Sequence, residues 1–196
     1  MTLRLVYLAF CALVIAGLVH VAVVLLIPAY GTKDAYATLS KDYELLKFRQ
    51  LTGNNSSGLL SDIDPFFAYG TCHFDFSEEG VSIIAPKFDT FWSATVINQD
   101  GSVVYSLNSR TAIDSKLELI MLNPVQILRL REVQPPEIEN SIVVETDMKA
   151  GFVVLRVLQP DDSWAGAAST FLEKVKCAPY TPAIAEGAAL PQAVIQ

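Results

Sequence analysis

The sequence predicts an α+β protein: an N-terminal transmembrane helix, then an exported antiparallel β-sandwich-like domain with a few flanking helices. Residues 5–27 form a run of twenty-three residues that carries no formal charge. About 20 apolar residues are enough to cross the hydrocarbon core of a bilayer. After residue 66, short segments alternate apolar and polar side chains, and Gly, Asp and Ser turns separate them, as in an antiparallel sheet.

The charges are distributed unevenly about the apolar run. Thirteen of the fourteen basic residues and all twenty-one acidic residues follow it, which leaves a formal charge of −8 on that part of the chain. Nucleic acids and anionic lipid surfaces attract basic patches. The composition therefore argues against a nucleic-acid partner and against docking on anionic lipid.

The apolar run is expected to remain as an anchor. The h-region of a cleaved signal peptide spans about 7–15 residues and ends near a small-x-small site. The only comparable site here, Ala29 to Gly31, has a bulky Tyr30 in the middle. Arg4 and the free amine precede the run, so the positive-inside rule places the N-terminus in the cytoplasm and the domain outside. We expect a cytoplasmic tail at 1–4 and the transmembrane helix at 5–27.

The rest of the chain divides into three further parts. Pro28 to Thr32 is expected to end the membrane helix, and a connecting helix is predicted for 32–51, with Tyr36, Leu39, Tyr43 and Leu46 on one face. This helix would pack against the domain; the alternative is a stalk that continues the membrane helix. A loop with sequons at Asn54 and Asn55 follows, then the β-rich exported domain at 59–177 and a disordered tail at 178–196.

Within the exported domain the patterns predict strands and two helices. We expect a strand at 66–76 with its return strand at 81–85, and a hairpin of 91–98 with 103–107 around an Asp-Gly turn. A single strand is expected at 116–122, and a last strand pair at 141–146 and 151–158. A helix is predicted for 164–176. Residues 123–132 could alternate as a strand, but Asn123 followed by Pro124 is a helix start, so a short helix is preferred.

Cys72 and Cys177 are the two cysteines outside the apolar run, since Cys11 lies within it. In an oxidising compartment they would form a disulfide that stabilises the fold by about 4–5 kcal/mol in the chain-entropy model. The alternative is a pair of buried free thiols. We expect the disulfide.

The sequence contains no pattern that indicates catalysis, a cofactor or a metal site. Cys72 and His73 are neighbours in a predicted strand, so their side chains point to opposite faces and cannot share a proton. His73 and Asp75 share a face that we expect to be solvated. Phe91 and Trp92 could line a ligand cleft, although packing in the core is the preferred interpretation.

One face of the apolar run carries small residues. Ala9, Ala12, Ala16 and His20 recur at spacings of three and four, so they fall on one side of a helix. Small residues allow helices to approach closely, and a polar residue within the membrane favours a partner over lipid. This face is therefore a candidate helix–helix interface; the alternative is that the alanines are incidental and that His20 remains neutral.

Residues 64–108 resemble the family called domain of unknown function 1254. Pro86, Asp89-Thr90 and Trp92-Ser93 match the family's order of a proline, an Asp-Thr pair and an aromatic-Ser step. Lys87-Phe88 depart from the asparagines usual before the Asp-Thr pair. The resemblance extends more loosely through 151–156 and 160–164 to Cys177.

The resemblance implies a location and a partner. Small members of this kind are single-span envelope proteins of Gram-negative bacteria, accompanied by a second protein that carries the sister domain of unknown function 1214. This places the helix in the inner membrane and the domain in the periplasm. No catalytic residues carry over.

The expected function is a non-enzymatic subunit of a membrane complex; the alternative is a ligand-binding β-sandwich for a lipid or glycan fragment.

Overall fold

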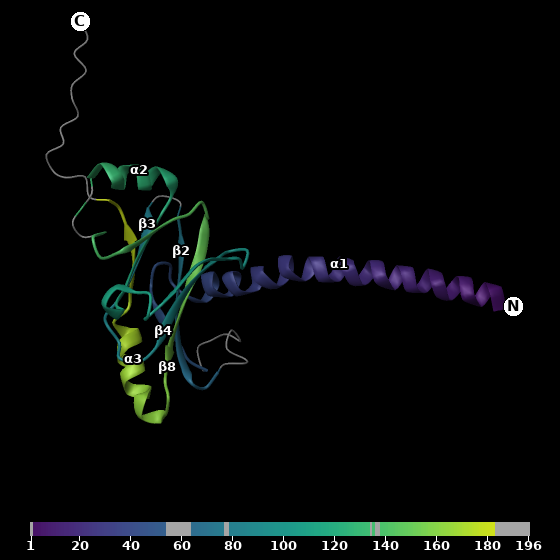
Figure 1. The fold of residues 1–196 in the computed structure, drawn as a ribbon, viewed down its shortest axis with the longest axis horizontal. Coiled ribbons are helices and arrows are strands. Elements are labelled where there is room, and N and C mark those ends of the chain that lie inside the picture. Colours follow the sequence, from purple (N-terminus) through teal and green to yellow (C-terminus); the bar gives the residue numbers. More distant parts are fainter. Residues whose placement is uncertain (1, 54–63, 77–78, 134, 136–137, 183–196) are drawn as a thin grey trace, which may run out of the picture.

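The protein is described by a computed structural model that covers residues 2–53, 64–76, 79–133, 135 and 138–182 (Figure 1). Its helices are α1 (Thr2–Asp42), α2 (Pro124–Val133) and α3 (Ala165–Glu173), with short 3₁₀ turns η1 (Ile113–Ser115) and η3 (Asp162–Trp164). Its strands are β1 (Arg49–Leu51), β2 (Phe67–Asp75), β3 (Gly80–Ala85), β4 (Trp92–Asn98), β5 (Val103–Asn108), β6 (Leu117–Leu122), β7 (Ile142–Glu145), β8 (Ala150–Leu158) and β9 (Lys176–Tyr180).

Helix α1 is continuous from Thr2 to Asp42. The predicted end of the membrane helix between Pro28 and Thr32 is therefore wrong, because the helix continues as the stalk alternative requires. Its C-terminal part nevertheless packs against the domain, as preferred, since Leu39 is buried and α1 contacts β2. The predicted connecting helix at 32–51 is also wrong beyond Asp42. Leu46 adopts a positive φ of 58°, which helices of L-residues do not tolerate, and residues 49–51 form strand β1 instead.

The strands form two sheets. The first has five strands in the order β1-β2-β8-β4-β5, all antiparallel, and the second has four in the order β7-β6-β3-β9. The pairing of β6 with β7 is parallel, so the second sheet is mixed. The prediction of an α+β fold with an N-terminal apolar helix is confirmed, and the prediction of a purely antiparallel domain is wrong.

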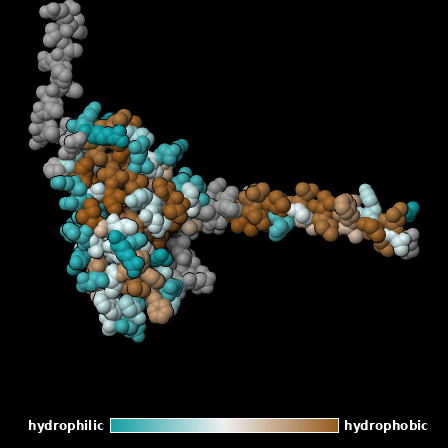
Figure 2. Space-filling view, viewed as in Figure 1, coloured by the Kyte–Doolittle hydropathy of each residue, from teal (hydrophilic) through white to brown (hydrophobic). Residues whose placement is uncertain are grey.

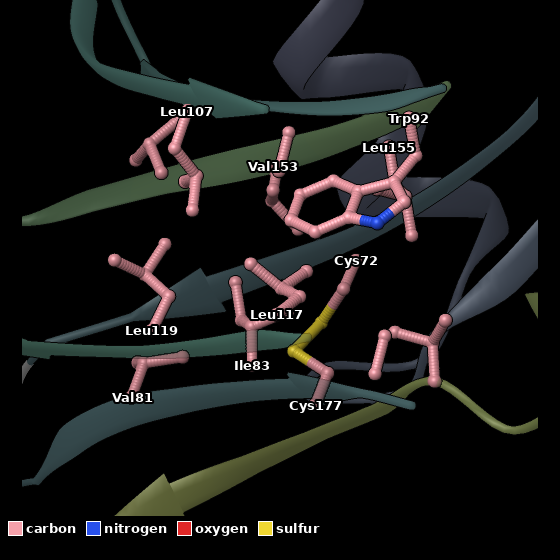
Figure 3. Close-up of a cluster of buried hydrophobic side chains, with 14 of the residues drawn as sticks. Cys72, Val81, Ile83, Trp92, Leu107, Leu117, Leu119, Val153, Leu155 and Cys177 are labelled. Atoms are coloured by element: carbon pink, nitrogen blue, oxygen red, sulfur yellow. A yellow bond between two sulfur atoms is a disulfide. The ribbon is translucent and has the colours of Figure 1, made fainter. Parts of the chain in front are cut away.

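Both sheets contribute to one apolar core (Figure 3). Trp92, Val153 and Leu155 come from the first sheet, and Ile83 and Leu117 come from the second. Helix α3 adds Ala168, Phe171 and Leu172 at one end of this core. A second, smaller cluster lies under α2, where Ile127 and Leu130 pack with Ile120 and Leu122 of β6.

The strand positions agree well with the sequence pattern, but two predicted pairings do not. The hairpin of β4 and β5 is confirmed, with Gly101 at a positive φ of 86° in its turn. However, β2 and β3 belong to different sheets, and so do β7 and β8. Strand β2 pairs instead with β8. On its other side β8 approaches β4 closely at Gly151, where an added Cβ would lie 2.5 Å from the carbonyl oxygen of Ile97.

The predicted helix after Asn123 is confirmed, and its cap explains why. The Asn123 side chain accepts the Gln126 N–H at 2.8 Å, and the Gln126 side chain accepts the Asn123 N–H at 2.9 Å. This reciprocal pair is a capping box, which satisfies two backbone donors at a helix start. The local signal for a helix therefore outweighs the alternation of apolar residues that would suit a strand.

The end of the domain differs from the prediction. Residues 176–180 form strand β9, which pairs with β3, so the domain continues past Cys177 and the predicted tail does not begin at 178. The predicted helix at 164–176 ends at Glu173. The expected disorder of 183–196 and the sequons at Asn54 and Asn55 lie outside the described residues.

Candidate functional site

The apolar part of α1 extends away from the domain. Thr2–Ile27 is long and apolar enough to cross a membrane, a test that signal sequences also pass, and none of it is buried against the described chain. Figure 2 shows apolar residues along almost the whole of this projecting segment. In water this surface would be costly, at about 25 cal/mol per Å² of exposed apolar area. The helix therefore needs an apolar environment outside its own chain.

The small-residue face of α1 is a shallow hollow. Ala12, Ala16 and His20 line it together with Ile15, Val19 and Val23. Ala9 lies further toward the N-terminus and is exposed, as are Ala12, Ala16 and His20. The structure thus places three of the four predicted residues along one shallow concave strip of the helix surface, and small residues allow a second helix to approach closely.

The structure joins Cys72 and Cys177 by a disulfide, with Cα atoms 6.5 Å apart. Cys72 lies in β2 of the five-stranded sheet and Cys177 in β9 of the four-stranded sheet, so the bond links the two sheets through the core (Figure 3). The bond closes a separation of 105 residues. Cys11, in the apolar helix, is the remaining cysteine and is free.

The structure does not support a ligand cleft at Phe91 and Trp92. Trp92 is 0% exposed and belongs to the core, and its indole N–H donates to the Ser115 carbonyl at 3.2 Å. Phe91 precedes β4 and is half-buried, and its carbonyl accepts the Leu158 N–H at 2.7 Å. The preferred interpretation of core packing therefore holds for Trp92.

His73 is buried, which corrects the expectation of a solvated face. It is 4% exposed, on the outer face of the five-stranded sheet, where the C-terminal part of α1 contacts β2. Leu39 of α1 is buried, and the Leu46 N–H donates to the His73 carbonyl at 3.0 Å. Burial lowers the pKa of His73 below its ordinary value of 6.5, because the charged imidazolium is poorly solvated there.

A groove lies where the edge strands β1 and β9 approach α3. Its apolar residues include Phe48, Leu172 and Val175, and charged Lys47, Arg49, Glu173 and Lys176 surround them. Phe48 is positioned by Gly70 of β2, since a Cβ there would lie 2.5 Å from the Phe48 ring. The described residues include no group of three or more His, Cys, Asp or Glu side chains able to hold a metal ion.

An aromatic cluster on the outer face of the five-stranded sheet was not predicted from the sequence. It consists of Phe67, Tyr69 and Arg156. The Phe67 and Tyr69 ring centroids are 6.4 Å apart, and the Arg156 guanidinium lies 5.4 Å from the Phe67 centroid. Arg156 comes from β8, so only the pairing of β2 with β8 brings the cluster together. The sequence carries no local signal for that pairing.

Comparison with known proteins supports the fold alone. No family model and no curated protein matches the chain. The crystal structure of the VPA0106 protein from Vibrio parahaemolyticus is similar, with a TM-score of 0.56 at 15% sequence identity over 81% of this chain. An uncharacterised protein from Burkholderia cenocepacia is also similar, with a TM-score of 0.48 at 13% identity over 76% of this chain. This chain spans 39% and 38% of the lengths of those two structures.

Proposed function

We propose that this chain is a single-span envelope protein that serves as a non-enzymatic subunit of a membrane complex. In this proposal α1 anchors the chain in the inner membrane, with the N-terminus in the cytoplasm and the sandwich-like domain in the periplasm. The observation that carries the proposal is that none of the apolar segment Thr2–Ile27 is buried against the described chain. A disulfide between Cys72 and Cys177 supports an oxidising compartment.

The surface of α1 supports a partner within the membrane. Ala12, Ala16 and His20 line a concave strip on α1 that a second helix could fill. Under the family resemblance, a protein with the sister domain of unknown function 1214 suits the role of partner.

Crosslinking and co-purification from native membranes test the proposal. Ala16→Leu fills the concave strip and His20→Leu removes its polar group, so each should reduce recovery of a specific partner several-fold. Val14→Leu is the matched control, because position 14 lies two residues before Ala16 and so points to the opposite side of the helix. Recovery of the monomer alone, or equal losses in all three variants, would contradict the proposed interface.

The groove between β1, α3 and β9 supports a second candidate function, the binding of a lipid or glycan fragment. Its apolar residues suit an acyl chain, and Lys47 and Lys176 suit an attached anionic group. A ligand that binds only the native state raises the melting temperature. Short-chain lysolipids and small glycan fragments should therefore raise the melting temperature of the chain in lipid nanodiscs, and Lys176→Glu should reduce that rise. No rise with either class would reject this candidate.

A further inference from the structure

We propose that the outer face of the five-stranded sheet lies against the headgroup layer of the bilayer that α1 crosses, and that the aromatic cluster of Phe67, Tyr69 and Arg156 contacts it. This inference rests on the proposed membrane anchoring and adds the orientation of the domain. The partner surface is a bilayer of zwitterionic lipid, since the formal charge of −8 after the apolar run disfavours anionic lipid.

The direction of α1 sets the orientation. The C-terminal part of α1 contacts β2, and the helix then leaves the domain on the side of β2 and β8, across the direction of the strands (Figure 1). Burial of the Tyr36 hydroxyl raises its pKa, and the negative charge of the nearby Asp75 in β2 raises it further. A membrane crossed by the first part of α1 would therefore face the outer surface of the five-stranded sheet.

The distance along α1 is short enough for contact. Eight residues separate Ile27, where the apolar segment ends, from Tyr36. At a rise of 1.5 Å per residue, eight helical residues span about 12 Å. The headgroup layer on each side of a bilayer is about 5–7 Å thick. Side chains that project from the sheet can fill the remaining few ångströms.

The aromatic cluster has the chemistry of a membrane interface. Phe67 and Tyr69 are half-buried, and both pair with β8 in the sheet, so their backbone is held in place. Tyrosine rings favour the headgroup level, and arginine bonds phosphate oxygens well. Arg156 is exposed and held by Ser93 Oγ, which accepts its Nε–H at 2.6 Å.

Fluorescence quenching by a spin label on the lipid headgroup tests the orientation. The full chain with Cys11→Ala carries either Arg156→Cys or Val125→Cys, and one fluorophore is attached to the new thiol. Val125 lies on α2, which packs on the other sheet, and it is exposed like Arg156, so the two positions match in accessibility. Both variants are reconstituted in phosphatidylcholine vesicles, and unaltered melting temperatures show that both remain folded.

The expected result is quenching several-fold stronger at position 156 than at position 125. Equal quenching at the two positions, or stronger quenching at 125, in a chain that floats with the vesicles overturns the orientation and leaves the anchoring intact. A chain that does not float with the vesicles overturns the anchoring, and the orientation with it. The two failures are therefore distinguishable.

Discussion

His73 is a titratable side chain that the fold keeps away from water. It lies under the C-terminal part of α1, with Leu39 buried beside the same strand. The ionisable groups around this junction are Tyr36 and Tyr43 of α1, Asp75 of β2, and Glu44 and Arg49 in the segment that follows the helix. The imidazole is therefore neutral in the native state over a wider pH range than in the unfolded chain.

Stability is expected to fall as the pH drops below about 6.5. Burial lowers the pKa of His73 in the folded chain, so the unfolded chain binds the proton first, and each pH unit between the two pKa values costs up to about 1.4 kcal/mol. Urea unfolding of the full chain in detergent between pH 7.5 and 5 measures this loss. His73→Gln should flatten the dependence, and an unchanged slope in that variant would contradict the account.

The disulfide between β2 and β9 acts at the scale of elements, because it ties one sheet to the other. Its loop of 105 residues predicts a contribution of about 4–5 kcal/mol in the chain-entropy model. Cys72→Ala, Cys177→Ala and the double variant should each lose a similar amount, since any one of them removes the same bond. Denaturant unfolding measures the three losses, and a double loss equal to the sum of the two single losses would contradict the prediction.

Elements whose signals are local could be predicted from the sequence. The hairpin of β4 and β5 has its Asp-Gly turn, and α2 has its Asn123 cap, so both were expected where they occur. The pairings of β7 with β6 and of β8 with β2 depend on contacts between distant segments. Alternation along a strand states which face is buried but does not identify the neighbouring strand.

The same limit explains the errors around the domain edges and the candidate site. The apolar spacing from Tyr36 to Tyr43 fits α1, but the positive φ of Leu46 does not fit a helix. Residues Arg49–Leu51 then pair with β2 as an edge strand. Strand β9 contains Pro179 and was not predicted, because a proline in a strand is compatible only with an edge position that the sequence does not reveal. The aromatic cluster was not predicted because Arg156 lies beside Phe67 and Tyr69 only through the pairing of β8 with β2.

At the scale of the whole molecule, the chain consists of a projecting apolar helix and a domain built on two sheets around one core (Figures 1 and 2). The helix leaves the domain from the outer face of the five-stranded sheet, so a membrane that holds α1 would also set which face of the domain lies toward the bilayer. The core is closed around Trp92, and the concave surfaces described above lie on α1 and at the edge of the sheets.

The central claim is that α1 remains in the membrane as an uncleaved anchor with the domain on the periplasmic side. Alkaline extraction of native inner membranes, followed by mass measurement of the retained chain, tests it most directly. The account predicts the full 21.4 kDa chain in the membrane pellet, with its domain digested by protease added to the periplasmic side. A shorter chain without the Thr2–Ile27 segment, recovered in the soluble fraction, would contradict it.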